Sequence, residues 1–147
     1  ENAMLRKFIS ALLALTGLLI GLGAFGHSFM GRRALDTGLA SLPIDAHTDK
    51  LIYLVWYFCG GCMLVFGVLV IWSAWKITRG ERGALFASSL VGIFYLLTGV
   101  ISLAYMREPF WSVFVILGGL ALVLSAALGI ASARERAAPG LAAPRMP

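Results

Sequence analysis

Four long stretches without a charged residue constrain this chain more than any other feature. Residues 8–31, 51–75, 83–106 and 109–133 contain no Asp, Glu, Lys or Arg, and the stretches are 24, 25, 24 and 25 residues long. A helix that rises 1.5 Å per residue needs about 20 apolar residues to cross about 30 Å of hydrocarbon. We therefore expect an all-α membrane protein, an antiparallel bundle of four transmembrane helices over residues 5–27, 46–76, 83–106 and 109–134.

The rest of the chain is too short for a second domain. Of the 147 residues, 60% are hydrophobic and only 13% are charged, against about 25% charged in soluble domains. We expect one membrane domain over residues 4–136, with residues 1–3 as a remnant of expression cloning ahead of Met4. The tail 137–147, rich in Ala and Pro, is expected to be disordered. The first stretch also resembles a secretory signal, but its length favours a retained helix.

The basic residues indicate the orientation. Eight of them lie before the first stretch, between the second and third, or after the fourth: Arg6, Lys7, Lys76, Arg79, Arg82, Arg134, Arg136 and Arg145. Four lie on the opposite side: Arg32, Arg33, Lys50 and Arg107. The positive-inside rule places both termini in the cytoplasm of a multi-pass inner-membrane protein. Because these charges form no basic face interleaved with stacking aromatics, we expect no nucleic-acid partner.

The connection between the first two helices is the longest. Residues 28–50 form an outer loop in which 32–42 could make a short surface helix, and Asp45 or Thr48 could cap the second transmembrane helix. The short links elsewhere predict that the second and third helices pair, and likewise the third and fourth.

Small residues recur at helical spacing and predict how the helices pack. Within lipid, apolar side chains gain little by moving to another helix, so close backbone approach must hold helices together. The packing candidates are Gly17, Gly21, Gly92, Gly99, Ser125 and Gly129. They predict a compact bundle and a non-catalytic protein that binds partner proteins, lipid or its own copies through these faces.

A pair of thiols gives an alternative function. Cys59-Gly60-Gly61-Cys62 has the Cys-x-x-Cys spacing at which two thiols can form a reversible disulfide, and the glycines could relax the helix. The four residues resemble the redox motif of quinone-coupled membrane thiol oxidases, the disulfide-bond-forming and vitamin K epoxide reductase types. That resemblance implies a quinone cofactor. Those families also use a cysteine pair in an outer loop, whereas this chain has only two cysteines.

Two other polar features are candidate sites. Tyr95 lies at the centre of the third stretch, where its hydroxyl needs an interhelical hydrogen bond or a bound ligand. At the outer face, His27, Met30, His47 and Met106 are imidazole and thioether groups of the kind that suit copper. The alternative reading is that these histidines satisfy helix ends and lipid headgroups.

Ionisable residues at membrane depth are absent, which argues against ion-coupled transport. The chain is similar in size and helix number to small multidrug resistance transporters but lacks the acidic residue of their first helix. We therefore favour a non-catalytic protein without a cofactor over an enzyme. The lipid bilayer, a membrane partner protein or a second copy are its expected partners, and thiol–quinone chemistry and copper binding are the alternatives.

Overall fold

A computed structural model describes residues 2–137 of the chain and the side chains of residues 4–133. The expected disordered tail therefore falls outside the described residues, apart from Ala137. The described part is all-helical and contains no strand. Four helical stretches, Met4–Leu39, Ala46–Thr78, Arg82–Met106 and Pro109–Ala133, are long and apolar enough to cross a membrane. The expectation of four helices long and apolar enough to cross a membrane is confirmed, which is compatible with a multi-pass membrane protein.

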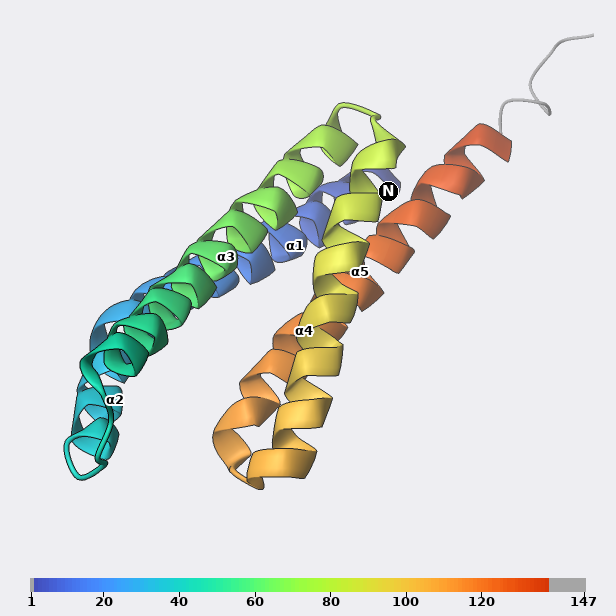
Figure 1. Cartoon of the computed structure of the whole chain (residues 1–147). Coiled ribbons are helices and arrows are strands. Elements are labelled where there is room, and N and C mark those ends of the chain that lie inside the picture. The colour runs from blue at the N-terminus through green and yellow to red at the C-terminus, as the bar shows by residue number, and fades with distance from the viewer. Residues whose placement is uncertain (1, 138–147) are drawn as a thin grey trace, which may run out of the picture.

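The first long helix continues into the connection that precedes the second long helix. Helix α1 (Asn2–Phe25) passes through a π-helical turn, η1 (Gly26–Met30), into α2 (Gly31–Leu39). Sequence reasoning placed a separate surface helix in 32–42, whereas α2 extends α1 and lies beside α3 (Ala46–Thr78) (Figure 1). The helix continues because the Gly31 N–H donates to the Gly26 carbonyl, and no proline occurs before Pro43.

The second half of the chain forms another helical hairpin. A short 3₁₀ turn, η2 (Arg82–Ala84), leads into α4 (Leu85–Met106), and a second one, η3 (Pro109–Trp111), leads into α5 (Ser112–Ala137). The main helix pairs are α1 with α3 and α4 with α5 (Figure 1). The α3–α4 pairing expected from the short link is a minor one, because that link joins the two hairpins at one end only.

Glycines allow close backbone contact inside each hairpin. A Cβ on Gly17 would lie 2.8 Å from the Gly67 carbonyl oxygen, so α1 and α3 touch backbone to backbone at this crossing. In the other hairpin, a Cβ on Gly92 would lie 3.1 Å from the Gly118 carbonyl oxygen, and one on Gly99 would lie 2.6 Å from the Val115 nitrogen. Dispersion between closely approaching backbones therefore holds both pairs together.

The two hairpins pack together in one half of the molecule and diverge in the other. In α3 the buried residues begin at Gly60, in α4 they end at Gly99, and among the described residues of α5 they begin at Gly118. The core, which includes Leu13, Val70 and Leu128, thus occupies the half where α1 begins and α3 ends. We call this the closed half and the other the open half, where Figure 1 shows the hairpins apart. The sequence expectation of a uniformly compact bundle missed this divergence.

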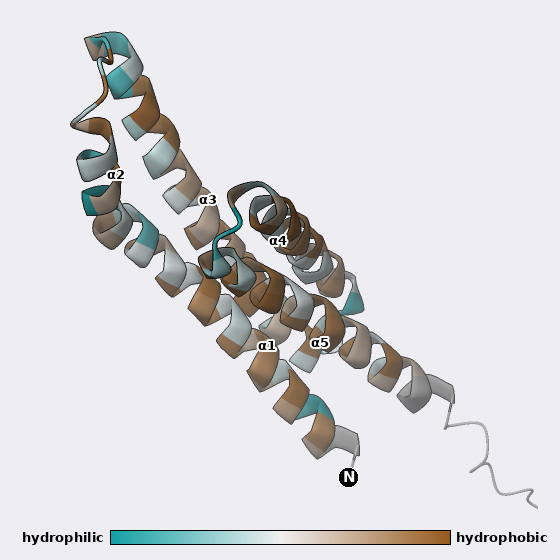
Figure 2. Ribbon diagram, turned by 90° about the horizontal axis from the view of Figure 1, so that it is seen from below, coloured by the Kyte–Doolittle hydropathy of each residue, from teal (hydrophilic) through white to brown (hydrophobic). Residues whose placement is uncertain are grey.

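Buried hydroxyl groups in the closed half form hydrogen bonds between helices. The Ser10 hydroxyl donates to the Ala74 carbonyl at 2.6 Å, and the Ser73 hydroxyl donates to the Ala84 carbonyl at 2.8 Å. Ser88 and Ser125 are hydrogen-bonded to each other at 2.7 Å and join α4 to α5. Figure 2 shows hydrophilic residues gathering instead on α2 and at the start of α3, while the long helices are mainly hydrophobic.

Candidate functional site

The densest group of polar contacts lies where η1 and α2 face α3. A π-turn within a helix frequently marks a functional site. Here it brings His27 and Ser28 against Gly60 of α3, where any Cβ would collide with the Ser28 hydroxyl. Gly60 is therefore explained by this helix contact.

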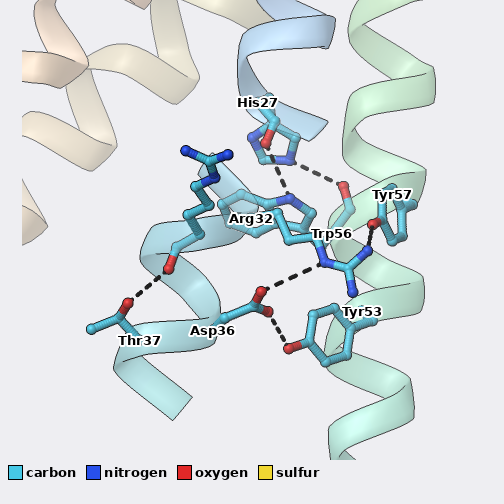
Figure 3. Close-up of polar contacts among 8 residues, drawn as sticks. His27, Arg32, Asp36, Thr37, Tyr53, Trp56 and Tyr57 are labelled. Carbon is cyan, nitrogen blue, oxygen red and sulfur yellow. Dashed lines mark hydrogen bonds and ion pairs between the residues drawn. The ribbon is translucent and has the colours of Figure 1, made fainter. Parts of the chain in front are cut away.

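His27 and Trp56 form a reciprocal pair across this contact (Figure 3). The His27 Nε2 lies 3.0 Å from the Trp56 carbonyl oxygen, and the Trp56 Nε1 donates to the His27 carbonyl at 3.2 Å. Their rings stack with centroids 4.0 Å apart. Because a carbonyl oxygen only accepts, the His27 Nε2 is the donor in the first of these bonds. The pair fastens η1 to α3.

The Arg32 guanidinium lies about one helical turn beyond His27 (Figure 3). The Arg32 Nη1 donates to the Tyr57 hydroxyl at 2.7 Å, and its Nε lies 3.7 Å from an Asp36 carboxylate oxygen. The Tyr53 hydroxyl donates to the other Asp36 oxygen. The Arg32 guanidinium also lies over the Tyr53 ring, 5.5 Å from its centroid. Together these contacts hold α2 along α3, although the Arg32 side chain remains 52% exposed.

Asp45 caps the N-terminus of α3. Its carboxylate accepts hydrogen bonds from the Thr48 hydroxyl and from the backbone N–H groups of Thr48 and His47. These bonds, the one from the Thr48 hydroxyl above all, lower the pKa of Asp45 below its ordinary value. Of the two capping residues considered from the sequence, Asp45 occupies the N-cap.

The four candidate copper ligands are not gathered into one site. His27 is paired with Trp56, while His47 precedes Trp56 by nine residues on α3, about 13 Å along the helix axis. The Met30 side chain is 78% exposed, and Met106 lies at the end of α4 in the other hairpin. Within the described part of the chain, no three His, Cys, Asp or Glu side chains lie close enough together to hold a metal ion.

The two thiols lie on an unbroken helix. Cys59 is exposed, Cys62 is half-buried, and both are free. Side chains three residues apart on a helix have Cβ atoms about 5–6 Å apart, whereas a disulfide needs about 3.5–4.5 Å. Oxidation would therefore require α3 to unwind locally. Of the two intervening glycines, Gly60 packs against Ser28, and Gly61 has open space around it.

Tyr95 lies at the junction of the two hairpins and is 2% exposed. Its ring stacks on Phe114 with centroids 5.4 Å apart and meets Phe66 edge-on at 6.3 Å. The described residues offer its hydroxyl no hydrogen-bond partner. The interhelical hydrogen bond expected from the sequence is thus not among the described contacts. The Tyr95 ring of α4 instead packs against Phe66 of α3 and Phe114 of α5.

The remaining packing glycines differ in how closely the neighbouring helix approaches them. Gly21 has room for a Cβ, with the Gly67 Cα 4.0 Å away, and Gly129 likewise has its nearest neighbour, a Leu85 methyl, at 4.0 Å. Gly60, Gly67 and Gly118 are tighter. Helical spacing also placed Gly60 and Gly67 on the packing face of the second helix, whereas Gly118 was not singled out, because close approach depends on which helix faces which.

Sequence reasoning missed the group formed by Arg32, Asp36, Tyr53 and Tyr57. A signal was present, since Arg32 and Asp36 are four residues apart, and Tyr53, Trp56 and Tyr57 have the spacing of one helix face. These residues could not be recognised as one site, because nothing in the sequence indicated that α2 would lie along α3.

Comparisons of the chain with protein-family models, with curated proteins and with solved structures find no match.

Proposed function

We propose that the chain is a non-catalytic, multi-pass protein of the inner membrane that binds a partner protein through an outer arm. The outer arm consists of α2, the connection 40–45 and the first two turns of α3. The observation that carries the proposal is the length of α3, whose 33 residues span about 50 Å. Even at a tilt of 40° it rises about 38 Å, which exceeds a hydrocarbon core of about 30 Å.

The chemistry of the outer arm supports this role. The arm carries most of the charged residues of its side of the molecule, including Arg32, Arg33, Asp36 and Lys50. The Arg32 and Asp36 contacts to Tyr57 and Tyr53 fix α2 on α3, so a partner would meet a preorganised surface. The glycine faces that the sequence offered for partner binding are occupied by contacts within each hairpin, which favours the arm as the binding surface.

Site-specific photo-crosslinking in intact cells tests the proposal. A photoreactive residue at Ala34, which is exposed on α2, should give one discrete protein adduct. The matched position is Ile101, which is 65% exposed on α4 in the open half and should give no such adduct. Equal adducts at both positions, or none at Ala34, would overturn the proposal. An adduct of twice the mass of the chain would identify the partner as a second copy.

The orientation has a separate test. In a Cys59→Ala, Cys62→Ala background, His47→Cys should react with a membrane-impermeant maleimide in intact cells, because the proposal places the outer arm outside the cytoplasm. Labelling that occurs only after the membrane is permeabilised would reverse the orientation. The exposed position of His47 ensures that a negative result in intact cells is not due to burial.

A further inference from the structure

A groove follows the contact between α1 and α3. It consists of two hollows of about 130 and 240 Å³ that share Phe25 and Leu64 in their walls. The first hollow reaches Ile71 in the closed half, and the second reaches Tyr57 at the start of the open half. The two hollows are therefore neighbours along the α1–α3 contact, and together they make up the groove.

The groove has the length and the walls that a hydrocarbon chain requires. From Ile71 to Tyr57 it covers 14 residues of α3, about 21 Å along the axis, which is more than half of a hydrocarbon core of about 30 Å. Its floor is low where glycines replace side chains, and a Cβ added at Gly61 would meet nothing within 4 Å. Its walls are Leu, Val, Ile and Phe side chains, which offer an acyl chain close dispersion contacts.

Two polar side chains lie at the outer end of the otherwise apolar groove. Ser28 and Tyr57 line it there, and the described residues give the Ser28 hydroxyl no hydrogen-bond partner. The Tyr57 hydroxyl accepts from Arg32, whose guanidinium is thereby held beside the mouth of the groove. A guanidinium has five N–H donors. Two of the Arg32 donors face Tyr57 and Asp36, which leaves three directed at no described side chain.

The Arg32 guanidinium is the group that would bind an anion. Asp36 lies 3.7 Å from its Nε and Tyr57 accepts from its Nη1, and its remaining N–H groups are available to a ligand. Guanidinium groups bind phosphate oxygens in a bidentate manner, which distinguishes them from the point charge of a lysine. The aromatic rings of Tyr53 and Tyr57 flank the guanidinium, as is typical of the headgroup region of a membrane.

We propose that this groove binds one anionic phospholipid, with an acyl chain along the α1–α3 contact and the headgroup phosphate on Arg32. The headgroup end of the site uses Arg32 of the outer arm, but the lipid proposal does not depend on a partner protein binding that arm. The lipid would seal the outward side of the α1–α3 contact.

The test is a titration of the purified full-length protein in detergent micelles with phosphatidylglycerol, read by native mass spectrometry. We expect one saturable bound lipid, weaker retention of phosphatidylcholine, and no retention of glycerol phosphate, which has the headgroup chemistry without the acyl chain. Arg32→Gln should weaken phosphatidylglycerol binding about tenfold, the effect of losing one charge-assisted hydrogen bond. Gly61→Leu, which fills the groove, should also weaken it.

Matched variants control for fold and charge. Gly119→Leu places the same side chain at another helical glycine with nothing within 4 Å of its Cβ, and it lies away from the groove on α5. Arg107→Gln removes one positive charge from the other hairpin. Both should bind phosphatidylglycerol as the unchanged protein does. Wild-type binding by Arg32→Gln and Gly61→Leu would overturn the proposal, and equal retention of glycerol phosphate would reassign the site to free phosphate.

Discussion

The close contact of α1 and α3 at Gly67 allows a quantitative test of whether backbone contact stabilises the α1–α3 hairpin. A Cβ at Gly67 would lie 2.6 Å from the Gly21 nitrogen and 2.7 Å from the Gly17 carbonyl oxygen, and both of these atoms belong to the backbone. To reach an ordinary contact of 3.4 Å, the second distance must increase by about 0.7 Å. Since no flexible side chain can move aside, the two helices must separate, and the packing of their neighbours changes with them.

The cost of Gly67→Ala follows from comparison with Gly61→Ala on the same helix. Alanine at either site gains about 0.5–1 kcal/mol of helix preference. At Gly61 a Cβ meets nothing within 4 Å, so only Gly67→Ala adds the overpacking cost of about 1–3 kcal/mol. We expect the two variants to differ by that amount in free energy of unfolding, with Gly67→Ala the less stable.

Reversible unfolding by SDS in mixed micelles, followed by tryptophan fluorescence, measures this difference. Gly21→Ala provides a second control in α1, because its Cβ would lie 4.0 Å from the Gly67 Cα, an ordinary contact that should be tolerated. If Gly67→Ala unfolds at the same SDS fraction as Gly61→Ala or at a higher one, close backbone contact does not stabilise the α1–α3 hairpin, and the packing argument is refuted.

Three further outcomes are expected. Tyr95→Phe should raise the free energy of unfolding by about 1–3 kcal/mol in the same titration, because it removes a buried hydroxyl without a described partner; a loss of stability would show that the hydroxyl is bonded. Diamide treatment followed by alkylation and intact mass measurement should find both Cys59 and Cys62 alkylated, since the unbroken α3 holds them too far apart; a product carrying an intramolecular disulfide would restore the redox hypothesis. The lowered pKa of Asp45 means that its cap stabilises α3 above the ordinary Asp pKa of about 3.9 and is lost as the pH falls through the lower folded value. Below pH about 4, amide exchange at Thr48, corrected for its intrinsic rate, should therefore accelerate in the unchanged protein but not in Asp45→Asn, which caps without titrating; equal pH profiles would refute this role.

The pattern of charged residues was sufficient to predict the four membrane helices. Desolvation of a charge in hydrocarbon is so costly that charge-free stretches of 24 or 25 residues leave few alternatives. Residue type alone was less informative for sites. The two histidines could be read as copper ligands, but the structure pairs His27 with Trp56 and leaves His47 about 13 Å further along α3. The pairing depends on the register between η1 and α3, which has no local sequence signature.

The glycines show the same division between local and tertiary information. Helical spacing identified Gly17, Gly92 and Gly99 as small positions, and all three lie at close crossings in the structure. The same spacing placed Gly60 and Gly67 on the packing face of the second helix, and both lie at close contacts. It did not single out Gly118, where a Cβ would collide with the backbone of α4 at Leu96, because the facing helix decides which small residues touch backbone.

The sequence by itself determined that the chain forms four helices long and apolar enough to cross a membrane, because transfer of charge and of unpaired backbone groups into hydrocarbon is a local cost for each segment separately. Only the tertiary structure decided that the helices form two hairpins that diverge in the open half, that α2 lies along α3, and that Arg32 stands at the mouth of a groove. These features depend on which helix faces meet, and between apolar faces in lipid that choice is made by close packing and a few hydrogen bonds.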